Sequence, residues 1–146
     1  MGSETDPIEI MNSCVNLLSN FFKPFSLQFF GSFEVEKYYK SNYSTIDRIY
    51  FHPCKSSIFM EDSPLSPIRE KKDSSLSQAL FALKDLKIDA LISCANTGAL
   101  LSASKIFLST LENVSRPALC VFIPTRKSPV AVLDVGANVS AKEHHL

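Results

Sequence analysis

The chain has 146 residues, a length typical of one domain with a single hydrophobic core, here residues 1–146. Fifteen Lys and Arg balance fifteen Asp and Glu, so the net charge of zero provides no overall field that would attract nucleic acid or an anionic membrane. The four widely separated cysteines include no Cys-x-x-Cys pair, which argues against a zinc knuckle and a disulfide scaffold. No apolar run resembles a membrane span or a secretion signal. The chain is therefore expected to be a cytoplasmic protein with reduced thiols.

A first helix is predicted to begin at Asp6 and Pro7. Asp6 is a suitable N-cap, Pro7 suits the first helical position, and Glu9 lies where a capping box places a carboxylate. Residues 1–5 are too few for a strand and a turn, so a parallel sheet would lack the strand that leads into this helix. The apolar face of the helix consists of Ile8, Met11, Val15 and Leu18.

Two buried strands are predicted next, with a short helix between them. Residues 25–31 form an apolar run that ends at a glycine, and residues 46–52 form a second run that is ended by Pro53. The helix between them is expected at residues 33–39.

Residues 56–73 are predicted to form an irregular surface loop. Pro64 and Pro67 interrupt regular structure, and a basic cluster of Arg69, Lys71 and Lys72 follows. The cluster has two interpretations, namely a solvated surface or a group of cations that face an anionic substrate.

Asp73 or Ser74 is expected to cap the next helix. Its apolar face repeats at helical spacing and consists of Leu76, Ala79, Leu80, Leu83 and Leu86.

The most informative stretch is a predicted strand at residues 88–95, followed by a polar turn and a helix at residues 97–111. Asn96 or Thr97 can cap the helix, and Gly98 lets the backbone approach a ligand closely. Because free N–H groups and the helix dipole favour negative charge at a helix N-terminus, this junction could bind an anion. The alternative is an ordinary capped helix. The helix is expected to bury Leu100, Phe107, Leu108 and Leu111, and the strand to bury Cys94.

Strands are also predicted at residues 118–123 and 130–135. The connection between them is too short for a parallel crossover, so they should form an antiparallel hairpin. Taken together, the alternating elements predict an α/β fold with a mainly parallel sheet that carries helices on both faces.

Three polar loops follow predicted strands, at residues 96–98, 124–126 and 134–138. In open α/β sheets ligands bind at the carboxyl ends of the strands, so we expect these loops to converge. Asp134 could act as a base or hold backbone amides in its loop. The usual glycine-rich dinucleotide, nucleotide and serine-hydrolase motifs are missing, and the histidines at positions 52, 144 and 145 lack the spacing of a metal site.

Six sequence blocks resemble, in order and spacing, the bacterial phosphate acyltransferase family PlsX. The most distinctive are Asn96-Thr97-Gly98-Ala99-Leu100 and Leu133-Asp134-Val135-Gly136-Ala137-Asn138-Val139. The remaining blocks are residues 60–64, 69–75, 116–119 and 124–125.

This resemblance implies a fold like that of isocitrate dehydrogenase and phosphotransacetylase, and a homodimer that uses no cofactor or metal. The implied reaction moves a fatty acyl group from acyl carrier protein to inorganic phosphate and gives acyl phosphate for phospholipid synthesis. Peripheral membrane association is implied through regions outside this sequence, and nucleic acid is not an expected partner.

The resemblance also implies a substrate site, without assigning any residue as the catalyst. The residues that would border the phosphate and the acyl group are Asn96, Thr97, Gly98, Asp134, Gly136 and Asn138, with assistance from Lys71 or Lys72.

The chain departs from the family pattern in several places. Ser32 replaces a usual aspartate, and Cys94-Ala95 replace a usual Ala-Gly. The family's opening strand, and a second half of similar length, would lie outside this sequence, so the chain is interpreted as the N-terminal half of such an enzyme. Two alternatives stay open: a non-catalytic binding or scaffold module of the same fold, and an enzyme of the same superfamily that uses another acyl donor.

Overall fold

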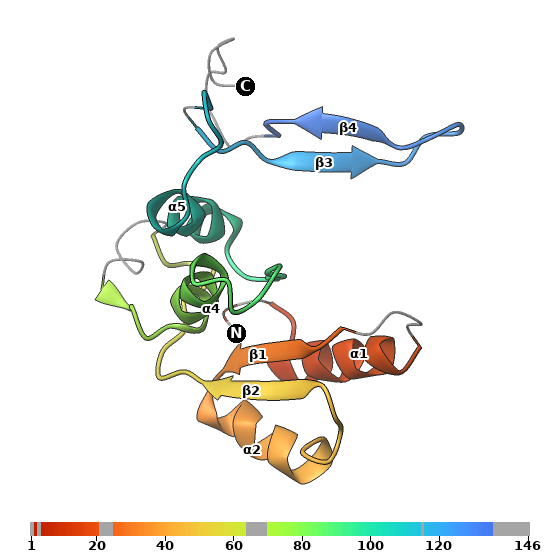
Figure 1. Ribbon diagram of the computed structural model, residues 1–146, viewed down its shortest axis with the longest axis vertical. Coiled ribbons are helices and arrows are strands. Elements are labelled where there is room, and N and C mark those ends of the chain that lie inside the picture. Colours follow the sequence, from red (N-terminus) through yellow and green to blue (C-terminus); the bar gives the residue numbers. More distant parts are fainter. Residues whose placement is uncertain (1, 3, 21–24, 64–69, 115, 136–146) are drawn as a thin grey trace.

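The computed structural model describes residues 2, 4–20, 25–63, 70–114 and 116–135 (Figure 1). Helices and strands are mixed along the chain, and one pair of strands is parallel, which confirms the α/β class. The elements are α1 (Pro7–Asn20), β1 (Leu27–Gly31), α2 (Phe33–Asn42), β2 (Ile49–Pro53), α4 (Ser75–Lys84), α5 (Thr97–Phe107), β3 (Cys120–Ile123) and β4 (Val130–Leu133). None of the described helices is long and apolar enough to cross a membrane.

Helix α1 begins where the sequence predicts. The Asp6 carboxylate accepts a hydrogen bond from the Ile8 N–H at 2.8 Å, and the Asp6 carbonyl accepts one from the Ile10 N–H at 3.1 Å. The predicted apolar face is buried at three of its positions, and it forms one hydrophobic core with α2 and β2. The buried members of this core are Met11, Val15, Leu18, Val35 and Ile49.

Strands β1 and β2 pair in parallel, and their register runs from Leu27 opposite Ile49 to Gly31 opposite Pro53. The predicted hairpin is also confirmed, because β3 and β4 pair antiparallel from Cys120 opposite Leu133. In the described part of the chain, these pairs form two separate two-stranded sheets rather than the single sheet that we expected.

The predicted strand at residues 88–95 is wrong, because these residues form no strand. A strand requires a neighbour that pairs with its backbone. Strand β1 pairs with β2 along one edge, and a cavity of about 450 Å³ lies between β1 and residues 88–95. As a result, Cys94 is exposed rather than buried, and 88% of Ile92 is exposed.

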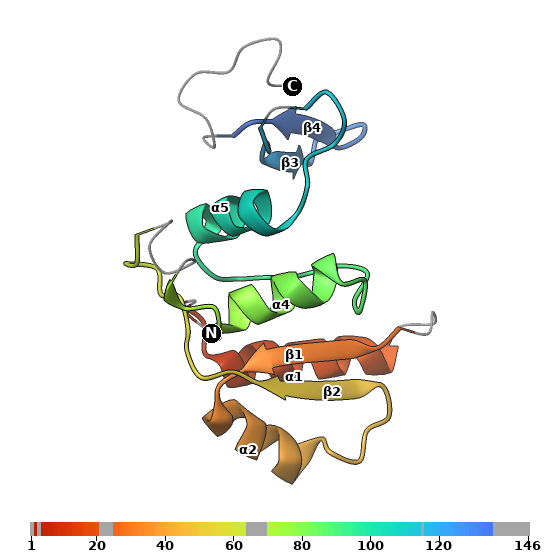
Figure 2. The same ribbon diagram turned by 60° about the vertical axis from the view of Figure 1, so that its left-hand side comes forward.

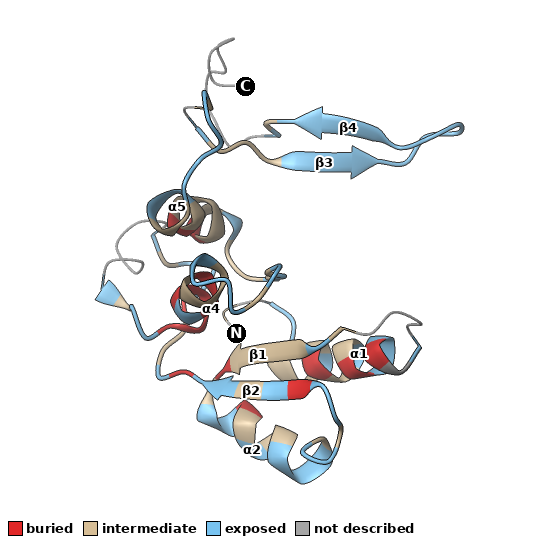
Figure 3. Cartoon of the chain, in the orientation of Figure 1, coloured by how far each residue is buried: buried red, intermediate tan, exposed pale blue. Residues whose placement is uncertain are grey.

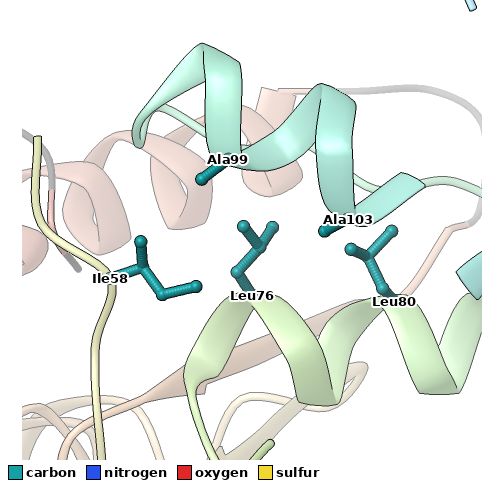
Figure 4. Packing of buried hydrophobic residues seen from close by; sticks show 5 residues of the cluster. All are labelled: Ile58, Leu76, Leu80, Ala99 and Ala103. Atoms are coloured by element: carbon teal, nitrogen blue, oxygen red, sulfur yellow. The ribbon is translucent and has the colours of Figure 1, made fainter. Parts of the chain in front are cut away.

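A second core joins α4 to α5. Figure 4 shows Leu76 facing Ala99 and Leu80 facing Ala103, so the two helices run in the same direction. Ile58 completes this core at the end where both helices begin.

Two predicted core residues beyond the ends of α4 and α5 are exposed rather than buried. Helix α4 ends at Lys84, and Leu86 follows in a left-handed conformation with 90% of its surface exposed. Helix α5 ends at Phe107, which leaves Leu111 80% exposed. Figure 3 shows buried residues on α1, α2, α4 and α5 and in β1 and β2, whereas β3 and β4 are exposed throughout.

Ser74 is the N-cap of α4. Its buried hydroxyl oxygen accepts a hydrogen bond from the Ser77 N–H at 3.3 Å, and its hydroxyl also pairs with the Ser77 hydroxyl at 2.9 Å. We expect Ser74→Ala to lower the free energy of unfolding by about 0.5–2 kcal/mol, because both interactions are lost in a buried place. Urea denaturation measures this change. The exposed Ser109→Ala serves as the control, and an equal effect of both substitutions would contradict the capping role.

Candidate functional site

The N-termini of α4 and α5 lie at the same end of the parallel helix pair. Ser74 caps one helix and Asn96 caps the other, and Ile58 packs between the first turns of both. Each helix N-terminus carries about half a positive charge and presents N–H groups that have no partner within the helix. Two such ends side by side favour an anion more strongly than one end alone.

Asn96 connects the start of α5 to the loop at residues 59–62. Its side-chain oxygen accepts a hydrogen bond from the Ala99 N–H at 2.9 Å. Its side-chain nitrogen lies 3.3 Å from the Phe59 carbonyl, 3.0 Å from the Met60 carbonyl and 3.3 Å from the Asp62 carbonyl. The amide group of Asn96 therefore fixes the helix end and the loop together.

Lys71 and Asp62 hold the same loop from its other side. The Lys71 ammonium donates to the Asp62 carboxylate at 2.9 Å and to the Ser57 carbonyl at 3.2 Å, and it lies 5.8 Å from the centre of the Phe59 ring. The Asp62 carboxylate also accepts the Phe59 N–H at 2.9 Å. Most of the hydrogen-bonding capacity of the Lys71 ammonium is thus used within the protein, so Lys71 orders the loop.

The Asp62 carboxylate gives this loop a pH dependence. Hydrogen bonds from the Phe59 N–H and the Lys71 ammonium hold the pKa of the Asp62 carboxyl below its ordinary value. A depressed pKa in the folded state adds stability above the unfolded pKa of about 3.9, and this stability is lost as the pH falls toward the folded pKa.

We expect Asp62→Asn to remove this contribution. The variant should be less stable than the unchanged chain at pH 6, and the difference should shrink as the pH falls below about 4 and Asp62 becomes protonated in the unchanged chain. Urea denaturation at several pH values measures the effect. Asp85→Asn is a matched control, because Asp85 forms an exposed ion pair with Lys87. A constant difference across this pH range would contradict the role of Asp62.

The backbone around the two lysines is held against the start of α4. The Lys71 carbonyl accepts hydrogen bonds from the Ser74 N–H at 3.0 Å and from the Ser77 hydroxyl at 3.2 Å. The Lys72 carbonyl accepts one from the Gln78 side chain at 2.9 Å. Lys72 itself is exposed, so its ammonium is available to solutes at this end of the helix pair.

The structure brings part of the predicted site together. Asn96, Thr97 and Gly98 form the start of α5, and Lys71 reaches the loop that Asn96 binds. Thr97 is exposed, while Asn96 and Gly98 are partly exposed. These residues lie beside the N-terminus of α4, whose first residues, Ser75 to Ser77, are buried.

The other predicted residues come from the hairpin and its continuation. Asp134 follows β4 in a left-handed conformation, and its N–H donates to the Leu119 carbonyl at 2.6 Å. The preceding Leu133 lines a hollow with Ser104, Lys105 and Leu108, among other residues, which places this segment at the C-terminal end of α5. Gly136 and Asn138 lie outside the described residues. The substrate-binding role of all these residues stays a prediction.

The residues that shape the loop were missed as functional candidates. The sequence pattern assigns no role to Asp62, which belongs to a matching block at residues 60–64, or to Phe59. A signal was available, since a carboxylate in a polar turn ahead of a basic cluster is well placed for a local ion pair.

Comparisons with known sequences support one family. The family model described as "Fatty acid synthesis protein" matches residues 1–146. A protein named "Phosphate acyltransferase" from Staphylococcus aureus strain bovine RF122 / ET3-1 is 40% identical over 147 residues, which cover 100% of this chain and 43% of the relative. The protein of the same name from strain Newman matches with the same identity and coverage. The chain thus spans less than half the length of these curated relatives.

Proposed function

The chain belongs to the fatty acid synthesis protein family, and from this membership we propose that the full-length protein is a phosphate acyltransferase. In the proposed reaction, a fatty acyl group moves from acyl carrier protein to inorganic phosphate. An oxygen of phosphate attacks the thioester carbonyl carbon, a carbon–oxygen bond forms, and the carbon–sulfur bond breaks. The carrier thiolate leaves and takes up a proton, and the products are acyl phosphate and the carrier thiol.

One observation supports this reaction most strongly, namely the paired N-termini of α4 and α5. Both the phosphate and the tetrahedral oxyanion carry negative charge, and backbone N–H groups that are fixed before binding stabilise such charge without reorganisation. Asn96 holds the loop at residues 59–62 against one of these N-termini through three carbonyl contacts. The anion would therefore meet a surface whose shape is already set.

We assign the following roles within this proposal. Thr97 and Gly98 supply N–H groups at the start of α5, Asn96 and Lys71 hold the loop beside them, and Lys72 attracts the phosphate. The residues after β4 complete the acyl side of the site in the full-length protein, and these are Asp134, Gly136 and Asn138.

The proposal extends to the setting in which the full-length protein works. We propose one domain over residues 1–146, a cytoplasmic homodimer, acyl carrier protein as the partner, and peripheral contact with the membrane that receives the product. Family membership supports the partner and the substrate, because acyl transfer in fatty acid synthesis draws on carrier-bound acyl groups.

The direct test measures acyl phosphate formed by the full-length protein from acyl carrier protein thioester and inorganic phosphate. The proposal expects product whose amount depends on both substrates. If phosphate binds but no acyl phosphate forms, the protein is a binding module of this fold and the enzyme assignment is wrong. If acyl phosphate forms only from another thioester, the protein is an enzyme of the same superfamily, and the assignment of acyl carrier protein as the acyl donor is wrong.

Lys72 offers a more local test of the phosphate side. We expect Lys72→Ala in the full-length protein to raise the KM for phosphate by about 1.4- to fivefold, because removing an exposed cation near an anion costs roughly 0.2–1 kcal/mol. Steady-state kinetics at low ionic strength measures the change, and 1 M salt should reduce it. Lys37→Ala, at an exposed position on α2, is the matched control. An unchanged KM for Lys72→Ala would remove Lys72 from the site.

A further inference from the structure

The loop at residues 59–62 presents two adjacent apolar side chains to solvent. Phe59 is 54% exposed and Met60 is 44% exposed. The preceding Ile58 is buried and points into the core between α4 and α5 (Figure 4). The chain therefore turns outward directly after this core, and the next two side chains are left largely uncovered in the part of the chain that the structure describes.

The backbone that carries these two side chains is held in place. The Phe59 N–H donates to the Asp62 carboxylate at 2.9 Å, and the Phe59 carbonyl accepts the Asp62 N–H at 3.2 Å. The Phe59 and Met60 carbonyls also lie 3.3 Å and 3.0 Å from the side-chain nitrogen of Asn96. Isolated exposed apolar residues are common on protein surfaces. An apolar pair on a fixed backbone differs from them, because it can bind a ligand at little cost in conformational freedom.

The pair lies beside the anion site of the proposed function. The Asn96 side chain that binds the Phe59 and Met60 carbonyls also caps α5 through the Ala99 N–H. The Lys71 ammonium lies 5.8 Å from the centre of the Phe59 ring. Apolar surface, a cation and the first N–H groups of a helix thus meet in one hydrogen-bonded unit. Such a unit suits a ligand that has a negatively charged head and an apolar tail.

We propose that Phe59 and Met60 form a platform that binds the fatty acyl chain of the substrate, at the carbons next to the reacting carbonyl. This inference rests on the proposed function, in which the tetrahedral oxyanion and the acyl phosphate both carry negative charge at one end of an alkyl chain. With that charge at the start of α5, the alkyl chain lies over the Phe59 ring and the Met60 side chain. The platform then favours a long acyl group over a short one, because the free energy gained rises with the apolar area removed from water.

A purely structural role accounts for only part of this arrangement. The Phe59 ring supports the Lys71 ammonium through a cation–π contact, yet more than half of the Phe59 surface remains exposed. The Met60 side chain is unbranched and polarizable, and such a side chain adapts readily to the shape of an apolar ligand. Both side chains therefore have apolar surface that a ligand can cover.

The test titrates the isotopically labelled 146-residue chain with octyl phosphate and with methyl phosphate, and it follows amide chemical shifts. The two probes carry the same charged group and differ only in the length of the alkyl chain. The variants are Phe59→Ala and Met60→Ala, together with Phe59→Leu, which keeps an apolar side chain without the ring. Phe33→Ala is the matched control, because Phe33 begins α2 and is 58% exposed.

We expect octyl phosphate to bind about tenfold more tightly than methyl phosphate, with shifts at Phe59, Met60 and the start of α5. Phe59→Ala should reduce this advantage by about fivefold and Met60→Ala by about threefold. Phe59→Leu and Phe33→Ala should keep the advantage within about twofold. The affinity for methyl phosphate should be similar in all variants, because the alkyl chain of this probe is too short to cover the platform.

Equal affinity of the two probes in the unchanged chain would overturn this inference and leave the anion site in place. Equal effects of Phe59→Ala and Phe33→Ala would also overturn it, as would an octyl phosphate response centred on residues 88–92, which line the cavity beside β1. If Phe59→Leu lost as much as Phe59→Ala, the contact of the ring with Lys71 would explain the effect instead of the apolar surface. The absence of any response to methyl phosphate would contradict the anion site of the proposed function itself.

Discussion

Replacing Leu80 with alanine is expected to lower the free energy of unfolding by about 2–5 kcal/mol, the range for a leucine truncated in a closed core. Leu80 is 1% exposed and faces Ala103 in the core between α4 and α5, so its truncation leaves a space inside this core. The loss would also loosen the contact that keeps α4 and α5 parallel. Urea denaturation followed by circular dichroism measures the change.

Leu86→Ala is the matched control for Leu80→Ala. Leu86 follows the same helix, but it is 90% exposed, so we expect a change within about 0.5 kcal/mol. If both variants lost the same stability, the core between α4 and α5 would not be the structural support of the site. The sequence pattern alone places both residues on one buried face and predicts similar losses of stability. The structure buries only Leu80, so the difference between the two variants tests the structure.

Replacing Asn96 with alanine in the full-length protein is expected to lower acyl phosphate formation by about 100-fold. The substitution removes the cap of α5 and the three contacts to the loop at residues 59–62, and a misplacement of about 1 Å in a site can cost this factor. Loss of the cap should also lower the free energy of unfolding by about 1 kcal/mol. Product formation and urea denaturation measure the two effects.

Asn96→Asp separates the two functions of this side chain. Aspartate can still accept the Ala99 N–H, but it has no N–H groups for the Phe59, Met60 and Asp62 carbonyls. We therefore expect nearly unchanged capping, together with a loss of activity close to that of the alanine variant. Asn42→Ala, which removes one exposed hydrogen bond on α2, should affect neither property. Full activity in Asn96→Asp would mean that the held loop does not matter for the reaction.

Local signals in the sequence were sufficient for much of the fold. The capping residue Asp6, the apolar spacing of α1 and the short connection before β4 all led to correct elements, because each depends on residues close together in the chain. The predicted strand at residues 88–95 is wrong for a physical reason. The segment has the apolar composition of a strand, but a strand also needs the edge of a neighbouring strand, and no pattern within the segment indicates whether such an edge is present.

The same distinction applies to the candidate site. The sequence predicts a helix cap at Asn96 or Thr97, and the structure shows that Asn96 is the cap. The contacts of its side chain with the carbonyls of Phe59, Met60 and Asp62 could not be predicted from the sequence, since they join positions more than 30 residues apart. The direction of α4 relative to α5 was equally hidden, because it depends on how Leu76 and Leu80 meet Ala99 and Ala103 (Figure 2 shows the two helices one above the other).

The most direct measurement is a phosphate titration of the isotopically labelled chain, followed by amide chemical shifts. We expect saturable shifts at the first residues of two helices, Ser75 to Ser77 in α4 and Thr97 to Ala99 in α5, with smaller shifts at Lys37 and Asn42 of α2. We also expect Asn96→Asp to weaken the response at both helix ends. Shifts confined to β3 and β4, or equal shifts over all lysine-rich surfaces, would contradict the claim that the paired helix N-termini form the anion site.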